Sequence, residues 1–194
     1  MEAIEKLKEL ALTAIPGATI EIVNSTPAAA QPALLIDREH ILGVAKFLKE
    51  DPRLQMDCCS CVTGVDYLAK GHIEVVYHLY SVALKHGPMV LKVRAPRDLE
   101  QCRVPSLTPL WRGCEFQERE AYDLYGVKFD GHPDLRRILM WDEFTDHPMR
   151  KDYVPPADYE WEPTPHDDTL VRAREAAGIV PPSAIEEADK AKKK

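Results

Sequence analysis

Long apolar runs, glycine-rich phosphate loops and paired C-x-x-C motifs are all missing from this chain of 194 residues. No segment approaches the roughly 20 consecutive apolar residues that a membrane-spanning helix needs. The first residues, MEAIEKLKEL, lack the apolar core of a signal peptide, and without a phosphate loop we do not expect this chain to bind nucleotides. We therefore expect a soluble protein of the cytoplasmic type that reaches a membrane only through other proteins.

Positive charge is also scarce, because 25 Lys and Arg face 32 Asp and Glu, which gives a net charge of −7. Such a balance disfavours general binding to nucleic acid or to anionic lipid. The length fits one domain with a tail, and the hydrophobic fraction of 45% is ordinary for a globular protein. The most suitable partner is therefore another protein surface.

Five cysteines are present, and three of them, Cys58, Cys59 and Cys61, lie close together in the sequence. Thiolates are suitable ligands for zinc or an iron–sulfur cluster, so an independent Cys-based metal or electron-carrier protein is one hypothesis. Against it, adjacent cysteines rarely reach one metal, and His72 and His78 are not at ligand spacing. Buried, reduced thiols on a strand are the favoured interpretation, and the role of the three cysteines stays open.

Helical and strand patterns are mixed along the chain, which favours the α+β class. Asp37 is a suitable N-cap for the second helix, and His86-Gly87-Pro88 is a typical turn between the strands of a hairpin. We expect a mainly antiparallel sheet of about four strands with helices packed on it. The predicted helices are 2–14, 38–50, 107–111 and 115–125, and the predicted strands are 18–23, 33–36, 72–82, 89–95 and 127–129.

The composition changes at Val154, after which prolines and acidic side chains are frequent and the chain ends in KAKKK. This composition is typical of a segment without a core of its own. We therefore predict one domain over residues 1–153 and an extended, Pro-rich, charged C-terminal arm over 154–194. The aromatic residues Tyr153, Tyr159 and Trp161 indicate that the arm lies along a partner.

Charged and aromatic residues are mixed most densely in residues 118–152, which we call the signature segment. Its first part is predicted to be helical and to end at Gly126, because glycine takes a left-handed cap without steric cost. His132-Pro133 and His147-Pro148 then force extended steps, and each is followed by a basic pair, Arg136-Arg137 or Arg150-Lys151. The guanidinium groups are therefore presented from rigid turns.

Three interpretations of the signature segment compete. General acid–base catalysis uses carboxylates and imidazole, which Glu118, Glu120, Asp123 and His132 supply, but Glu118 and Glu120 do not face each other on a helix and no nucleophile with its base accompanies them. Phosphate binding is disfavoured, because residues 115–152 hold ten acidic and six basic side chains. A specific protein interface, for which Arg, Tyr and Trp are favoured anchors, is the preferred hypothesis.

The same residues carry a resemblance to a known family. The runs Glu118-Arg119-Glu120, Asp123-Leu124-Tyr125-Gly126, Gly131-His132-Pro133-Asp134 and Arg136-Arg137-Ile138-Leu139 resemble the signature of the 30 kDa subunit family of respiratory complex I, the NADH:quinone oxidoreductase. His147 to Tyr153 resembles the next segment of that family, with Met149 where leucine is more usual, and Thr63 to Tyr67 resembles its turn before the central strands. The partner-interface residues that the resemblance implies are Glu118, Arg119, Glu120, Asp123, Gly126, Gly131, His132, Pro133, Asp134, Arg136, Arg137, His147, Pro148, Arg150, Lys151 and Asp152.

The resemblance implies a non-catalytic scaffold subunit in the peripheral arm of a proton-translocating NADH:quinone oxidoreductase. FMN, iron–sulfur clusters and quinone are then expected in partner subunits, and no catalytic residue, cofactor or metal in this chain. The expected neighbour is the subunit related to the hydrogenase large subunit, which helps to form the quinone site, on the cytoplasmic side of the inner membrane. The alternative is the equivalent subunit of a membrane-bound hydrogenase or of a ferredoxin-dependent complex, because this sequence does not separate the electron donors.

Overall fold

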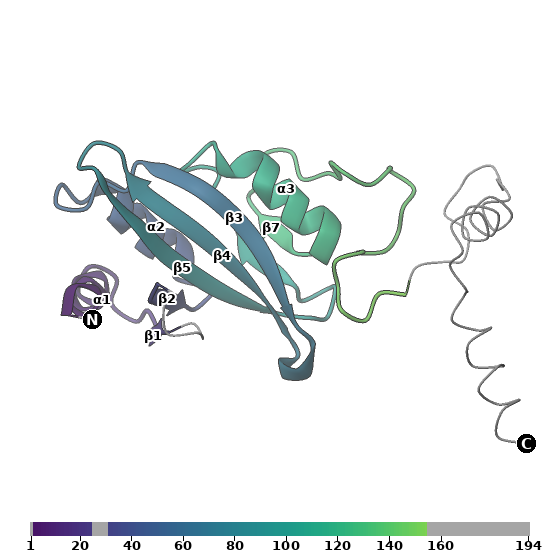
Figure 1. The fold of residues 1–194 in the computed structure, drawn as a ribbon, viewed down its shortest axis with the longest axis horizontal. Coiled ribbons are helices and arrows are strands. Elements are labelled where there is room, and N and C mark those ends of the chain that lie inside the picture. The colour runs from purple at the N-terminus through teal and green to yellow at the C-terminus, as the bar shows by residue number, and fades with distance from the viewer. Residues whose placement is uncertain (1, 25–30, 155–194) are drawn as a thin grey trace, which may run out of the picture. The chain divides into compact units, whose positions relative to one another are not determined.

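The computed structural model describes residues 2–24 and 31–154 (Figure 1). The predicted C-terminal arm lies outside the described residues except for Val154, so its course stays a prediction. The elements are α1 (Glu2–Ala14), β1 (Ile20–Val23), β2 (Ala33–Ile36), α2 (Ile41–Glu50), β3 (Cys58–Tyr67), a 3-10 turn (Leu68–Lys70), β4 (His72–Ser81), β5 (His86–Pro96), β6 (Arg103–Pro105), α3 (Cys114–Tyr125) and β7 (Lys128–Asp130).

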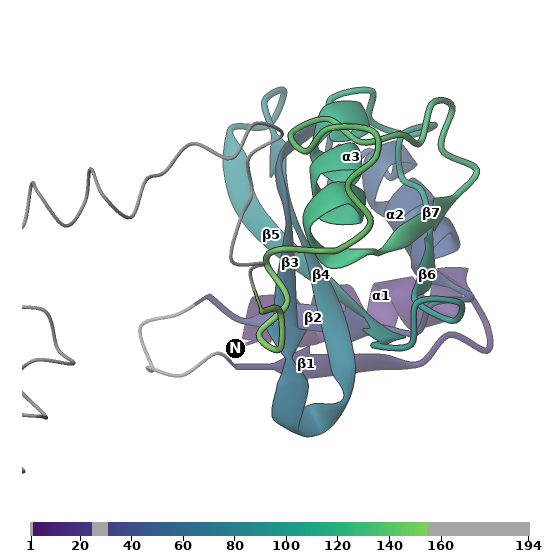
Figure 2. The same cartoon turned by 90° about the vertical axis from the view of Figure 1, so that its right-hand side faces the viewer.

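The predicted α+β class is confirmed, although the main sheet has five strands rather than about four. Its strand order is β1-β2-β5-β4-β3, and the β2–β5 pair is parallel while the other pairs are antiparallel. The sheet is therefore mixed. A second, parallel pair joins β6 to β7, and Figure 2 shows α2 and α3 on the same side of the main sheet.

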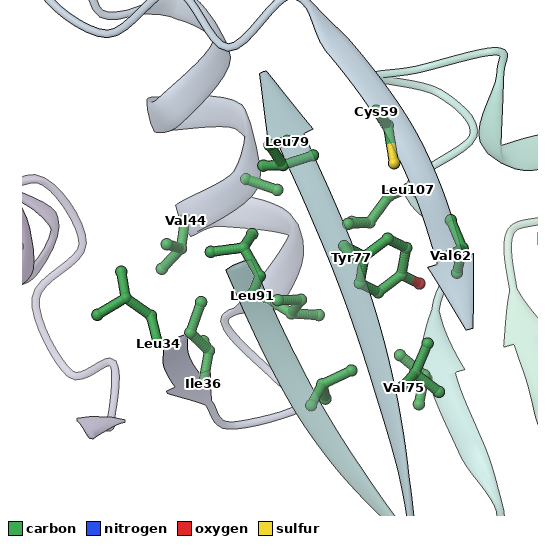
Figure 3. Close-up of a cluster of buried hydrophobic side chains, with 14 of the residues drawn as sticks. Leu34, Ile36, Val44, Cys59, Val62, Val75, Tyr77, Leu79, Leu91 and Leu107 are labelled. Carbon is green, nitrogen blue, oxygen red and sulfur yellow. The ribbon is translucent and has the colours of Figure 1, made fainter. Parts of the chain in front are cut away.

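The apolar core lies between the main sheet and the helices (Figure 3). The strand β4 lies between β5 and β3, and its alternate residues Ile73, Val75, Tyr77 and Leu79 are buried on the helix side. This alternation is what a strand with a packed face requires. The side chains that α2 buries against the sheet recur at helical spacing and are Ile41, Val44, Ala45 and Leu48.

The hairpin turn falls earlier than predicted. Residues 86–88 belong to β5, and the chain instead reverses direction between Ser81 and His86. The cause is a carboxylate from another part of the chain, since Asp57 accepts hydrogen bonds from the N–H groups of Val82 (2.8 Å) and Ala83 (3.0 Å). A side chain thus fixes the turn that the glycine and proline were expected to make.

Three further predictions were wrong. The expected turn at Thr63–Tyr67 is the end of the ten-residue strand β3, because Gly64 lets the Tyr125 ring of α3 pack on the strand: a Cβ there would lie 2.6 Å from that ring. The expected helix 107–111 is a single turn, since Glu118 takes the Leu107 N–H at 2.9 Å. The helix predicted from residue 38 begins at Ile41, because Asp37 first binds the His40 N–H in a turn.

Candidate functional site

Helix α3 carries residues 118–125, the first part of the signature segment, and packs beside β3. Its buried side chains include Glu118, Arg119 and Asp123, which lie on the side facing the molecule, whereas Glu120 is exposed. The expectation that Glu118 and Glu120 do not face each other is therefore confirmed. Three ionisable groups inside one short helix need fixed partners, because an unpaired buried charge is costly.

Glu118 joins α3 to the loop after β6. Its carboxylate accepts hydrogen bonds from Ser106 Oγ (2.5 Å), Thr108 Oγ1 (3.1 Å) and the Leu107 N–H (2.9 Å), and from the Tyr77 hydroxyl of β4 at 3.3 Å. Burial raises the pKa of Glu118 above its usual range, and the hydrogen bonds offset part of that rise. The residue fastens three parts of the fold at one point.

Asp123 holds the loop that follows β7. One carboxylate oxygen accepts the successive N–H groups of Ile138 (3.1 Å), Leu139 (2.7 Å) and Met140 (2.9 Å), and the other accepts Arg137 Nη1 at 2.6 Å. Burial alone would raise the pKa of Asp123, but these N–H groups and the guanidinium lower it below its usual range. A fully buried carboxylate therefore sets the path of three consecutive residues.

Arg119 and Arg137 complete the attachment of this loop to α3. The Arg119 guanidinium donates to the carbonyl oxygens of Arg136 (3.1 Å) and Arg137 (2.8 Å). Arg137 also donates to the Asp146 carbonyl at 3.2 Å and lies 5.5 Å from the centre of the Phe144 ring. Both guanidinium groups act inside the chain, so their charge is already engaged by its own acceptors.

Gly126 ends α3 in the left-handed conformation, with φ of 76°, as predicted. The structure adds a second requirement, because a Cβ at this position would lie 2.7 Å from the imidazole ring of His147. That ring bonds the Asp123 carbonyl through Nδ1 at 2.9 Å, and burial lowers the pKa of His147. Glycine is thus needed both for the cap and for the approach of the second His-Pro step.

The end of the signature segment returns to the sheet. Arg150 donates to the carbonyls of Tyr125 and Arg97, both at 2.7 Å, while Arg97 binds the carboxylates of Asp66 (2.7 Å) and Asp152 (2.6 Å). The Lys151 N–H adds a bond to Asp66 at 2.9 Å. These contacts fasten residues 150–152 to the ends of β3 and β5.

The remaining predicted residues lie toward solvent. His132 bonds the Glu115 carbonyl through Nε2 (3.0 Å) and accepts the Asp134 N–H at Nδ1 (3.1 Å), which fixes the first His-Pro turn. Arg136 pairs with Asp134 at 2.9 Å while 68% of its side chain stays exposed, whereas the Arg137 side chain is 12% exposed. The other predicted residues are Glu120, Gly131, Pro133 and Lys151, which are exposed, and Pro148, which is half-buried.

The structure adds functional candidates that the sequence did not indicate. Arg97, Asp66, Ser106 and Thr108 all support the signature segment, yet they lie far from their partners along the chain or on unpredicted turns. Asp66 in particular belongs to the strand end that was expected to be a turn. No local pattern signals such contacts, because side chains of this kind are usually solvated.

The five cysteines are free in the structure, and they do not form one group. An irregularity in the β3–β4 pairing at Ser60 turns Cys61 outward, while Cys59 is buried against the core. A hydrogen bond to Cys59, together with burial, raises the pKa of the Cys114 thiol, and burial raises the pKa of Cys61. Protonated thiols are poor metal ligands and poor nucleophiles.

One group of possible metal ligands occurs among the described residues, formed by Asp37, Glu39 and His40, whose donor atoms lie within 4.8 Å. The Asp37 carboxylate is already occupied, because it accepts the N–H groups of Thr19 (2.7 Å) and His40 (3.2 Å) and contacts His40 Nδ1 at 2.5 Å. This group therefore serves as the turn before α2.

None of the helices in residues 2–24 and 31–154 has the length and apolar character required to cross a membrane.

Sequence comparison places the signature segment in a defined family. The profile of the family described as respiratory-chain NADH dehydrogenase, 30 Kd subunit, matches residues 34–159. An NADH-quinone oxidoreductase subunit of Moorella thermoacetica is 45% identical over 122 residues, which cover 63% of this chain and 79% of that protein. The corresponding NADH-quinone oxidoreductase subunit of Azorhizobium caulinodans is 44% identical over 154 residues, which cover 77% of this chain and 69% of the relative.

One solved structure supports the same relationship, and a second shares the fold. The trypsin-resistant fragment 1–134 of Nqo5 is 30% identical, with a TM-score of 0.51, and the match covers 68% of this chain and 98% of the fragment. A chain of an archaeal membrane-bound sulfane sulfur reductase shares the fold, with a TM-score of 0.61 at 24% identity over 93% of this chain and 94% of that one. The chain belongs to the family of the 30 kDa subunit of respiratory-chain NADH dehydrogenase.

Proposed function

We propose that this chain is a non-catalytic scaffold subunit in the peripheral arm of a proton-translocating NADH:quinone oxidoreductase. The main support for the proposal is that the charged side chains of the signature segment are engaged within the chain itself. Glu118, Asp123, Arg119 and Arg137 all bind groups of their own chain. Residues committed in this way shape a surface rather than perform chemistry, since a catalytic acid or base must reach a substrate.

The family relationship supports a particular assembly for this chain. Relatives at about 45% identity are NADH-quinone oxidoreductase subunits, so we assign this chain to a complex in which NADH reduces quinone. In the proposal, FMN, the iron–sulfur clusters and quinone are held by partner subunits. The neighbour that the signature segment contacts is the relative of the hydrogenase large subunit that helps to form the quinone site, which we call the hydrogenase-like neighbour. The complex holds this chain on the cytoplasmic side of the membrane.

The test is to place an affinity tag on the full chain in its host, solubilise the membranes in mild detergent and capture the tagged protein. The proposal predicts a large assembly that contains the hydrogenase-like neighbour and oxidises NADH with a quinone as acceptor. Capture of the chain alone, or with proteins unrelated to electron transfer, would overturn the proposal. A tag on an unrelated cytoplasmic protein of the same host is the matched control for adventitious capture.

The same capture separates the alternative assemblies. An assembly that evolves hydrogen or takes electrons from ferredoxin, without NADH activity, would keep the scaffold role but replace the electron donor. The shared fold does not decide between them, because it also occurs in the membrane-bound sulfane sulfur reductase. A visible spectrum of the isolated chain tests the remaining hypothesis of a Cys-based electron carrier, since a bound cluster would colour the protein.

A further inference from the structure

The signature segment and the helix turn before it keep large apolar side chains in solvent beside the buried charges. Phe116 and Leu139 are each 61% exposed, and Ile138 is 37% exposed. We call these three residues the apolar strip. Trp141 is not included, because its ring packs against Phe144 at 4.8 Å.

The strip is held in place by the buried groups of α3. Arg119 lies 5.7 Å from the centre of the Phe116 ring and binds the carbonyls of the loop just before Ile138. Asp123 binds the N–H groups of Ile138 and Leu139, so the backbone of both residues faces the helix while their side chains project outward. Figure 2 shows the loop lying over α3. A surface fixed before binding loses little conformational entropy when a partner arrives.

The charges around the strip are mostly negative. The exposed charged residues of loop 131–146 are Asp134, Arg136, Asp142, Glu143 and Asp146, and Arg136 already pairs with Asp134 at 2.9 Å. Glu120 adds a further exposed carboxylate one helical turn after Phe116, and Arg112, four positions before Phe116, is exposed and lies 3.8 Å from the Glu115 carboxylate, so carboxylates still outnumber basic groups. The rim of the strip is therefore acidic, and an acidic rim selects for a basic one on the partner.

We propose that the apolar strip of Phe116, Ile138 and Leu139 is the contact through which this chain binds a partner protein that offers an apolar groove flanked by Lys and Arg. The proposal rests on the proposed function and specifies which part of the signature segment touches the neighbour. A second copy of this chain is disfavoured, because two acidic rims would repel each other. An anionic lipid surface is disfavoured for the same reason.

Complementary charge and exposed apolar anchors give the strip the anatomy of a protein interface, in which a few apolar anchors lie inside a polar rim. The charged residues that the resemblance implies for the partner interface then act indirectly. Arg119 and Asp123 position the strip, and the strip makes the contact.

The test uses the full chain in its host, with Leu139→Asp as the variant and Val82→Asp as the matched control. Val82 is 67% exposed at the hairpin turn, outside the signature segment. We expect Leu139→Asp to lower the fraction of the chain in the captured assembly by about tenfold or more, as loss of an interface anchor does, while Val82→Asp changes it less than about twofold. Thermal unfolding of both purified variants checks that each still folds.

A photo-cross-linking amino acid in place of Leu139 provides a readout that does not depend on assembly yield. The expected product joins residue 139 to a peptide of another subunit that contains Lys or Arg, and the same probe at residue 82 gives no such product. A cross-link to a second copy of this chain, a cross-link to lipid, or no cross-link at all would overturn the proposal. Normal assembly of Leu139→Asp would overturn it as well.

The outcomes also separate this proposal from the function on which it rests. If the captured assembly uses hydrogen or ferredoxin and residue 139 still cross-links to a subunit, the strip is correct and the electron donor is wrong. If the assembly oxidises NADH but Leu139→Asp assembles normally, the strip is wrong and the function stands. If the wild-type chain is captured alone, both are wrong.

Discussion

Helices α2 and α3 lie on the same side of the sheet but bury different kinds of side chain. The buried residues of α2 are Ile41, Val44, Ala45 and Leu48, which are all apolar, whereas those of α3 include Glu118, Arg119 and Asp123. Apolar burial is non-directional and tolerates substitutions of similar volume. A buried charge instead requires particular partners at particular distances.

The difference explains how one chain provides both a stable support and a defined surface. The region around α2 supplies apolar side chains to the core, while the region around α3 uses directional contacts to fix a loop in which Phe144 is the one buried large apolar side chain. Asp123 alone binds three consecutive N–H groups of that loop. Removing an apolar contact should therefore lower stability, and removing a charged contact should also release the signature segment.

The largest effect is expected for Asp123→Ala. It leaves three N–H groups without their acceptor and removes the carboxylate partner of Arg137, so we expect a loss of about 3–5 kcal/mol in the free energy of unfolding. Urea unfolding of the full chain measures this loss. Leu48→Ala in α2 should cost a comparable amount, about 2–5 kcal/mol, yet leave the N–H groups of residues 138–140 protected from hydrogen exchange. Equal loss of hydrogen-exchange protection at residues 138–140 in both variants would contradict the distinction between the two helices.

The two adjacent arginines should differ clearly in their contribution to the free energy of unfolding. Arg137→Ala removes the 2.6 Å contact to buried Asp123 and should cost about 2–4 kcal/mol of unfolding free energy, since it leaves that carboxylate partly unpaired. Arg136→Ala should leave the unfolding midpoint unchanged, because its side chain is largely exposed. Urea unfolding with equal midpoints for the two variants would contradict the structural distinction.

Gly126→Ala should be the next most severe change. The position combines a φ of 76° with a Cβ clash at 2.7 Å from His147, and we expect a loss of about 2–3 kcal/mol in thermal unfolding experiments. Gly131→Ala is the matched control, because its φ is 83° but no atom lies within 4 Å of the added Cβ. It should cost only the conformational strain of about 1 kcal/mol. Equal losses would mean that the approach of His147 is unimportant.

A smaller, pH-dependent effect is expected at Glu118. Because the pKa of this buried carboxyl is raised in the folded protein, the folded state holds its proton more tightly than the unfolded state, and stability falls as the pH rises through the raised pKa. Unfolding of the wild type and Glu118→Gln should therefore be compared from the acidic range to neutrality. We expect the wild type to lose stability relative to the variant as the pH rises through the raised pKa of Glu118.

Asp123 should show the opposite slope. Its pKa is lowered in the folded protein, so its contribution is present above the usual range of an aspartate and is lost as the pH falls through the lowered value. The stability difference between the wild type and Asp123→Asn should therefore increase with pH. Slopes of the same sign at Glu118 and Asp123 would show that one of the two environments is described wrongly.

The smallest effect is expected for Asp152→Ala. Its carboxylate binds Arg97 at 2.6 Å, but 52% of the side chain is exposed, and solvent screening limits such a pair to about 0.5 kcal/mol. Asp66→Ala should cost clearly more in the same urea titration, because that carboxylate is 1% exposed and also binds the Lys151 N–H. An Asp152 effect equal to that of Asp66 would contradict the importance of burial.

Local patterns in the sequence predicted the elements whose causes are local. The helix Glu2–Ala14 has the predicted bounds, α3 begins one residue before the predicted start, and Gly126 ends it as expected. The strand β3 was missed in part, because Gly64 looks like a turn residue until the Tyr125 ring that fills its space is known. Contacts between distant segments leave no periodic signal.

The sequence located the candidate site, but it did not show which of the side chains there are buried and which are exposed. Charged residues are usually solvated, so nothing in the pattern distinguishes buried Asp123 and half-buried Arg137 from exposed Glu120 and Arg136. The distinction depends on which face of α3 the loop covers. That choice is made by the hydrogen bonds of Asp123 to residues 138–140, which lie fifteen to seventeen positions further along the chain.

We infer that the chain fixes its own docking surface before any partner binds. Hydrogen exchange of the N–H groups of Ile138, Leu139 and Met140 in the isolated full chain tests it directly, because all three donate to Asp123. We predict protection of about a hundredfold or more over an unstructured peptide, and loss of that protection in Asp123→Asn. Exchange at the unstructured rate in the isolated wild-type chain, with protection only inside the assembly, would show that the partner orders the loop and would contradict the claim.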